Sequence, residues 1–110
     1  MDKYKSIFRR LLGYIKKILG YCEGKTLDEF TADSMLADAC LFNLCEIGET
    51  VRPYLSELNK RRPDVPWKHM RELQRQIMKM HEVIDTHLIW DIIQQDLTEL
   101  RKKLENELQH

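Results

Sequence analysis

Apolar residues recur at intervals of three and four along most of this chain, and this spacing restricts the fold more than any other feature. In residues 4–22 they form one continuous stripe: Tyr4, Ile7, Phe8, Leu11, Leu12, Ile15, Ile18, Leu19 and Cys22. The same spacing returns in residues 36–51, 70–80 and 89–108. Such a stripe places apolar side chains on one face of an α-helix. No segment alternates apolar and polar residues as a strand does, so we predict an all-α fold.

Residues between the first stripes mark where helices begin and end. Gly24 is suited to end the first helix. Thr26 and Glu29 match a capping box, which opens a short helical turn. Asp33 or Ser34 is suited to cap the second long helix. The first half of the chain therefore predicts two long helices joined by a short one.

Prolines divide the second half. Pro53 limits or kinks the second long helix and leaves a short helix to about Arg61. A loop at residues 63–66 ends in Pro66, which fits the first turn of a third helix. The inward residues of that helix are Met70, Leu73, Ile77 and Met80. Asp85 is a good cap for the last helix. We predict an up-and-down four-helix bundle with an extra short helix.

The length of 110 residues fits one domain, residues 1–110, without linker or repeat. Hydrophobic residues make up 43% of the chain, but no apolar run approaches the ~20 residues that cross a bilayer. The basic N-terminus keeps helical spacing and lacks the apolar block of a signal peptide. We expect a cytoplasmic protein that does not bind membranes.

Charge is unevenly distributed although the net charge is zero. Basic residues dominate residues 1–25 and 59–79, and acidic residues dominate residues 26–58 and 80–110. Zero net charge excludes a protein-wide attraction to nucleic acid, but charge blocks allow a local basic face. That face suits RNA, an oppositely patterned partner or a second copy of the chain.

Cysteine and histidine spacing gives no metal site. The three cysteines, Cys22, Cys40 and Cys45, form no C-x-x-C pair, so we expect buried, reduced thiols. The histidines lack ligand spacing such as H-E-x-x-H. We expect neither a metal nor a cofactor.

Three separated segments resemble one family. Residues 43–49 read N-L-C-E-I-G-E, similar to an N-L-x-x-I-G-E signature. Residues 63–67 read P-D-V-P-W, and residues 85–100 are similar to D-L-x-x-I-W-x-x-I-x-x-D-L-P-E-L. These segments, in this order, resemble the HepT-like toxins of the HEPN superfamily. The likeness covers essentially the whole chain.

The resemblance implies both an activity and partners. HepT-like proteins are helical homodimers that cleave RNA without a metal. They are encoded beside a small nucleotidyltransferase antitoxin, which uses ATP to adenylylate a tyrosine of the toxin. Their motif begins with Arg, which is usually followed by Asn. Four residues separate the Arg from a His, and a Tyr stands two positions after the His. In such a site Arg stabilises phosphate charge and His moves a proton to or from a ribose hydroxyl.

When Trp67 and Trp90 are aligned with the family's sequence without a gap, a different residue stands at every position of the motif. Gln74 takes the place of the Arg, and Arg75 takes that of the Asn. Lys79 falls at the His position and His81 at the Tyr position. A lysine ordinarily keeps its proton at neutral pH, so it is a poor proton shuttle. On this register we expect impaired cleavage and no adenylylation at residue 81.

A second register pairs Arg75 with His81. Five residues separate them, which lies inside the looser superfamily pattern of Arg, four to six residues, then His. The candidate catalytic residues are thus Arg75, His81 and Lys79. Arg71, Arg75 and Lys79 are also spaced as a solvated helix face, and His81 as a partly buried, hydrogen-bonded side chain.

Other polar and aromatic residues have structural interpretations. Asn43, Glu46 and Glu49 surround Gly48 and predict a polar network where two helices approach closely. Trp67 and Trp90 are expected in the core or at an interface.

Three functions follow from these patterns. The first is an active HepT-like ribonuclease that uses Arg75 and His81. The second is a non-catalytic homodimeric binding or scaffold protein that retains the HepT-like surface. The third is an assembly module outside toxin biology. The family context favours a toxin–antitoxin component with impaired cleavage.

Overall fold

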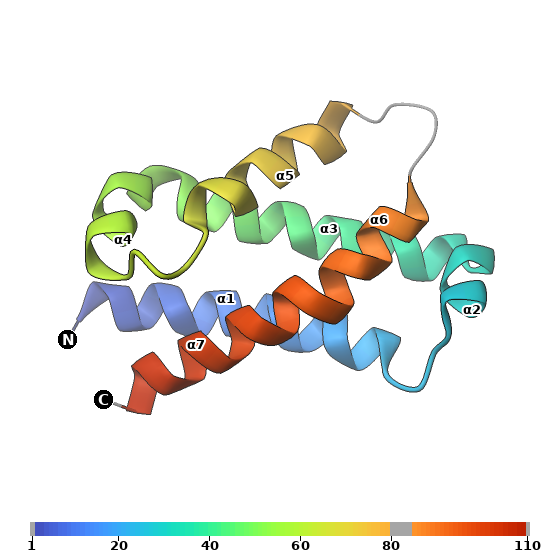
Figure 1. Ribbon diagram of the computed structural model, residues 1–110, viewed down its shortest axis with the longest axis horizontal. Coiled ribbons are helices and arrows are strands. Elements are labelled where there is room, and N and C mark those ends of the chain that lie inside the picture. Colours follow the sequence, from blue (N-terminus) through green and yellow to red (C-terminus); the bar gives the residue numbers. More distant parts are fainter. Residues whose placement is uncertain (1, 80–84, 110) are drawn as a thin grey trace.

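A computed structural model describes residues 2–79 and 85–109. The described residues form these elements: α1 (Lys3–Cys22), α2 (Leu27–Ala32), α3 (Ser34–Val51), the 3₁₀ turn η1 (Arg52–Tyr54), α4 (Leu55–Arg61), α5 (Trp67–Lys79), α6 (Thr86–Asp91), the π-helical segment η2 (Ile92–Leu97) and α7 (Thr98–Gln109). α6, η2 and α7 run on without a break, and we call them the C-terminal rod (Figure 1).

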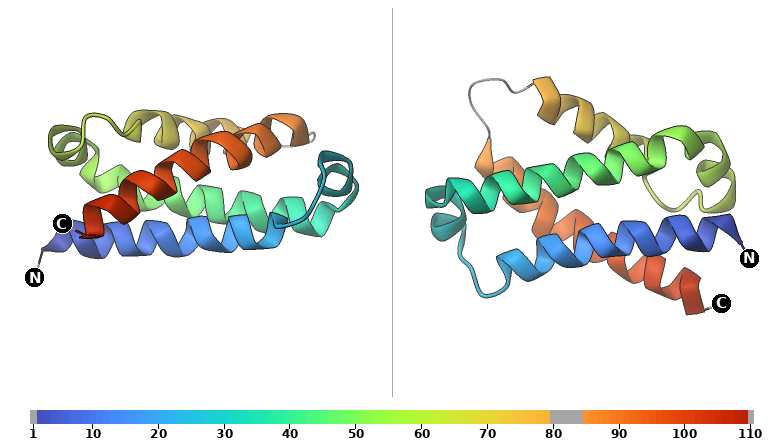
Figure 2. Two further views of the ribbon diagram at one scale, coloured as in Figure 1. Left: turned by 60° about the horizontal axis from the view of Figure 1, so that its bottom comes forward. Right: turned by 180° about the vertical axis from the view of Figure 1, so that it is seen from behind.

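Four long elements run up and down. α1 packs along α3, and α3 also packs along α5, each pair antiparallel (Figures 1 and 2). The C-terminal rod crosses α1 obliquely and packs on it through η2 and α7. The short helices α2 and α4 lie at opposite ends of the bundle, and the α4 end also holds both termini. The predicted all-α fold is confirmed for the described residues, and short helices form at both predicted places.

Aromatic rings fill the two ends of the core. Trp67 and Phe8 are fully buried and stack, with ring centroids 6.0 Å apart. Phe30 is also fully buried and meets the half-buried Trp90 at 5.2 Å. Phe30 comes from α2 and Trp90 from α6, so this contact closes the end of the bundle remote from the termini. Trp67 lies in the core and the half-buried Trp90 packs against it, consistent with the predicted core or interface position.

The helix ends follow the predicted capping residues. The side chain of Thr26 accepts from the backbone N–H of Glu29, and that of Glu29 accepts from the N–H of Thr26, which completes the capping box. Asp33 caps α3 and Asp85 caps α6 through their side-chain oxygens. Gly24 has a φ of 74°, the left-handed conformation that glycine adopts without strain.

The C-terminal rod differs from the regular helix that its periodicity predicts. Ile89, Ile93 and Leu97 lie four residues apart and are all buried. A regular α-helix completes a turn in 3.6 residues, so a repeated spacing of four drifts around it. The π-helical segment Ile92–Leu97 has wider turns. The wider turn keeps the three side chains on the core face. Met80, predicted to point inward from α5, lies outside the described residues.

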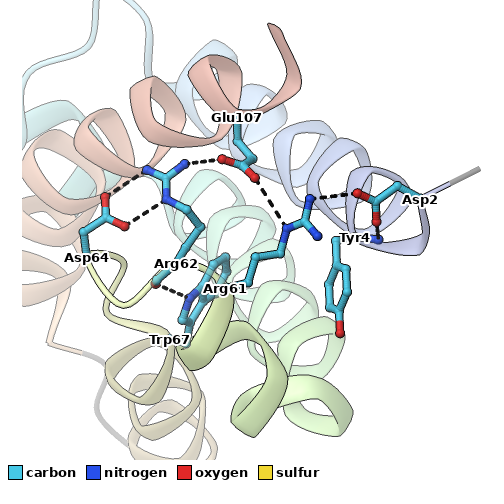
Figure 3. Close-up of polar contacts among 7 residues, drawn as sticks. All are labelled: Asp2, Tyr4, Arg61, Arg62, Asp64, Trp67 and Glu107. Carbon is cyan, nitrogen blue, oxygen red and sulfur yellow. Dashed lines mark hydrogen bonds and ion pairs between the residues drawn. The ribbon is translucent and has the colours of Figure 1, made fainter. Parts of the chain in front are cut away.

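A charged clamp holds the loop before α5 against the end of the rod (Figure 3). Arg62 donates to both carboxylate oxygens of Asp64, at 2.8 and 2.9 Å, and to Glu107 at 2.6 Å. The indole nitrogen of Trp67 donates to the backbone carbonyl of Arg62 at 2.9 Å. Arg61 bridges Glu107 to Asp2. The first turn of α5 is thereby fixed to both terminal helices.

Within residues 2–79 and 85–109, no helix is both long and apolar enough to cross a membrane.

Candidate nucleic-acid interface

Helices α3 and α5 approach each other closely at Gly48. A Cβ atom added there would lie 2.6 Å from the Cβ of Gln74 and 2.8 Å from its Oε1. Real Cβ atoms do not approach other atoms so closely, so a side chain at this position would force the helices apart. Glycine therefore sets the distance between the two helices, and Gln74 is the residue that fills the space.

The side chain of Gln74 joins a cation to an anion. It is only 4% exposed. Its Oε1 accepts a short hydrogen bond from Arg71 Nη1, and its Nε2 donates to Glu49 Oε2 at 3.1 Å. The Oε1 of Glu49 accepts from Arg52 at 2.9 Å. We call Glu49, Arg52, Arg71 and Gln74 the crossing network.

Electrostatics within the crossing network favour ionised Glu49. The hydrogen bond from Gln74 lowers the pKa of Glu49, and the hydrogen bond and positive charge of Arg52 lower it further. Arg71 adds a smaller attraction. The network therefore holds one carboxylate between two guanidinium groups at neutral pH, with a neutral amide between that carboxylate and Arg71.

A polar network does lie at Gly48, as predicted, but only one of the three predicted residues belongs to it. Glu49 belongs to it, whereas Asn43 donates to the Ala39 carbonyl of its own helix at 2.8 Å. Glu46 offers its backbone carbonyl to Thr50. Sequence reasoning missed the two members from α5, because side-chain contact between helices depends on how each is rotated. The one signal in the sequence was that a polar residue, Gln74, directly follows the inward Leu73.

The basic side chains of α5 differ in exposure. Arg71 is half-buried beside Gln74, whereas Arg75 and Lys79 are exposed. Arg75 forms a long ion pair with Glu72, at 3.4 Å, in which both side chains are more than half exposed. Arg75 and Lys79 lie four residues apart, on one side of the helix. This outer side is a surface that can meet phosphate groups without opening the fold.

The predicted catalytic residues are only partly placed. Arg75 and Lys79 lie within α5. His81 lies outside the described residues, so the second register, which joins Arg75 to His81, has no geometry. On the first register the motif Arg position is Gln74, and the residue that brings a positive charge to it is Arg71.

Apolar side chains are exposed on both helices of the crossing. Phe42 of α3 is 65% exposed and Met78 of α5 is 64% exposed. Phe42 precedes Glu49 by seven residues, and Met78 follows Gln74 by four, so each shares a helix face with its network residue. Met35, 82% exposed, lies seven residues before Phe42. We call Met35, Phe42 and Met78 the exposed apolar residues of α3 and α5.

Across the described parts of the chain, no three histidine, cysteine, aspartate or glutamate side chains gather as metal ligands would.

The comparisons with known proteins agree on one family. The family model described as ribonuclease HepT-like matches residues 11–107. A protein of Methanocaldococcus jannaschii, provisionally named an RNase, is 31% identical over 83 residues, covering 76% of this chain and 69% of that protein. A provisionally named RNase of Caldanaerobacter subterraneus is 27% identical over 103 residues, covering 87% of this chain and 92% of that protein.

A third relative is longer. It is a Methanocaldococcus jannaschii protein named gamma-glutamylcyclotransferase and, provisionally, RNase. It is 25% identical over 100 residues, and the match spans 45% of its length. No solved structure matches the chain significantly.

Proposed function

We propose that this chain, which belongs to the ribonuclease HepT-like family, is the RNA-acting component of a toxin–antitoxin pair. We further propose that its cleavage of RNA is impaired. The chemistry of the family is metal-independent cleavage of RNA, as the resemblance implies. The exposed basic side of α5 supplies the contacts to RNA phosphates. Such contacts position RNA without requiring a particular base sequence.

The observation that carries the impairment is the state of Gln74. It is a buried, neutral amide whose two ends are occupied by Arg71 and Glu49. At the motif Arg position it offers no positive charge for the phosphate that gains charge during cleavage. The guanidinium of Arg71 lies near the motif Arg position, but it is bonded to Gln74 and comes from a residue about one helical turn earlier. Binding is therefore kept while stabilisation of the transition state is reduced.

Lys79 adds a second reason for slow chemistry. It takes the position of the motif His, whose role is to accept and return a proton. Lysine ordinarily stays protonated at neutral pH and holds its proton too firmly for that cycle. Lys79 instead adds positive charge beside Arg75, which favours RNA binding.

The exposed apolar residues of α3 and α5 favour the second candidate function, a non-catalytic homodimeric scaffold. Phenylalanine and methionine side chains are enriched at the centres of protein interfaces. A second copy of the chain is the partner that the family implies. Both candidate functions include a homodimer and a cognate nucleotidyltransferase as partners, as the family resemblance implies.

The deciding experiment is RNA cleavage by the purified protein in a metal chelator, beside Arg75→Ala, Lys79→Ala and His81→Ala. We expect slow or absent cleavage by the wild type, and weaker RNA binding by Arg75→Ala and Lys79→Ala. Fast, stoichiometric cleavage that disappears in His81→Ala would overturn the proposal that cleavage is impaired. It would also show that Arg75 and His81 form the catalytic pair. No RNA binding at all would leave the scaffold function.

The proposal also predicts the response to the antitoxin. Adenylylation requires a tyrosine hydroxyl, and residue 81 is histidine. Incubation with the partner nucleotidyltransferase and labelled ATP should leave residue 81 unlabelled. A labelled peptide containing residue 81 would contradict this.

A further inference from the structure

Two cysteines meet where α1 ends. The Sγ atom of Cys22, the last residue of α1, lies 3.6 Å from the Sγ atom of Cys40 in α3. Both are free thiols and both side chains are buried. The two sulfur atoms are already in contact, and a disulfide bond needs them at about 2.05 Å. Joining them requires the two sulfur atoms to move closer by about 1.5 Å.

We propose that Cys22 and Cys40 form a reversible disulfide, a redox-sensitive covalent link between α1 and α3. The pair is selective, because the third cysteine does not share its position. Cys45 lies five residues after Cys40 on α3 and is half-buried. Five residues rotate a helix by about 500°, which is about 140° beyond one full turn, so Cys45 points away from the Cys40 direction.

A solvent-open cavity gives an oxidant access to this pair. Cys22 lines a cavity of about 640 Å³ at the end of α1. Its wall also carries Lys16, Lys25 and Arg101, with Glu23 as the acidic exception. A low-molecular-weight disulfide with carboxylate groups, such as oxidised glutathione, matches both the room and the positive charge. Cys40 is fully buried, so Cys22 is the thiol that meets the oxidant.

The reaction balances as two exchange steps. The Cys22 thiolate attacks one sulfur of the oxidant, forms a mixed disulfide and releases one glutathione thiolate. The Cys40 thiolate then attacks Cys22 Sγ and releases the second glutathione thiolate. The protein loses two electrons, which reduce the oxidant, and the two thiol protons end on the two released glutathiones. A reducing dithiol reverses both steps.

Burial sets the speed of this reaction. It raises the pKa of both Cys22 and Cys40, so few thiolates are present at neutral pH. The thiolate is the reactive form, so the bond forms slowly and faster at higher pH. The link therefore responds to sustained oxidation. Once formed, it encloses α2 in a covalent loop and restricts the unfolded chain, which raises stability.

The test oxidises the native full-length protein with oxidised glutathione and counts free thiols after denaturation. We expect three thiols to fall to one, a peptide that links Cys22 to Cys40, and full recovery with dithiothreitol. The melting temperature of the oxidised protein should rise by about 5–10 °C. Cys45→Ser should behave like the wild type. Cys40→Ser should stop at a glutathione adduct on Cys22.

Three outcomes would overturn the proposal. These are three unreacted thiols at every pH, a link that includes Cys45, and a Cys22–Cys40 link that appears only after denaturant is added. If Cys40→Ser does not fold, the peptide map of the oxidised wild type decides alone.

Discussion

Gln74 shows how one neutral side chain can separate two charged ones. Its amide accepts from Arg71 and donates to Glu49, so both ends are satisfied although the residue is buried. An arginine at this position would offer no acceptor to Arg71 and would add a positive charge between α3 and α5. The charge presented between α3 and α5 therefore depends on this single residue.

Restoring the family letters at two positions should restore chemistry. We expect the double substitution Gln74→Arg with Lys79→His to raise RNA cleavage about 10- to 100-fold over the wild type, since it supplies a phosphate-binding cation and a proton shuttle. The measurement is single-turnover cleavage of labelled RNA in a metal chelator. Gln76→Arg with Lys79→His is the matched control, because Gln76 is exposed on α5 away from Glu49. Equal rates for the two double variants would refute the role assigned to residue 74.

At the scale of elements, the crossing of α3 and α5 depends on the missing side chain at Gly48. The two helices are held at a distance that leaves no room for a methyl group beside Gln74. Elsewhere the chain has glycines without this constraint. Gly13 of α1 would meet nothing within 4 Å if it carried a Cβ atom.

Two alanine substitutions should therefore have opposite signs. Gly48→Ala should lower the free energy of unfolding by about 1–3 kcal/mol, because the helices must move apart. Gly13→Ala should raise it by about 0.5–1 kcal/mol, because alanine favours the helix and finds open space. Urea unfolding followed by circular dichroism gives both values. A Gly48→Ala protein as stable as the wild type would show that the crossing is looser than described.

The elements also show what sequence could predict. Apolar stripes identified the four long helices, because side chains on one face must share a core. Thr26, Asp33 and Asp85 marked helix starts, because capping is a local interaction. Contacts between helices, such as Gln74 with Glu49, depend on axial rotation, which spacing does not define. The π-helical turn was missed because steps of four also occur within the regular helices of this chain.

At the scale of the whole molecule, the charged clamp joins three distant parts of the chain. Arg62 is 18% exposed and Glu107 is 22% exposed, so this pair is shielded better than the other ion pairs of α7. Asp64 is half-exposed, and its hydrogen bonds with Arg62 lower its pKa to about 2. The ion pair between Arg62 and Glu107 is therefore the part of the clamp that water screens least.

Removing the clamp arginine should cost more than removing a surface one. Arg62→Met should lower the free energy of unfolding by about 1–3 kcal/mol, because it leaves Glu107 without its shielded partner. Arg101→Met breaks an exposed pair with Glu105 and should change stability by less than about 0.5 kcal/mol. Thermal or urea unfolding of both variants checks this, and similar losses would contradict it.

The contribution of Asp64 should depend on pH. Its folded pKa lies below its ordinary value of 3.8, so its stabilisation is present above that value and is lost as the pH falls towards about 2. The difference in stability between wild type and Asp64→Asn should be at most about 1 kcal/mol at pH 7, because the pair is solvated. That difference should shrink to near zero at about pH 2. A difference that stays constant across this range would assign the effect to packing.

The proposed dimer belongs to this scale too. Phe42→Glu should shift the protein from dimer to monomer by at least about 10-fold in dissociation constant, because a charge would be buried at the contact. Tyr21→Glu is the control, since Tyr21 is 42% exposed on α1, on the far side of α3 from α5. Analytical ultracentrifugation separates the two. Dissociation caused by both variants, or by neither, would place the contact elsewhere.

The π-helical turn in the C-terminal rod makes η2 the place where the rod accommodates one extra residue. A π turn contains one residue more than an α turn, and each α-helical residue turns the chain by about 100°. Deleting Gln94 or Gln95, both exposed, would let the rod become a regular helix. The turn would still close, so Leu100 and Leu104 would keep their place on α1. The same deletion inside the regular helix α7 would instead rotate everything after it by about 100°. The rod can thus lose one residue at η2 but not within α7.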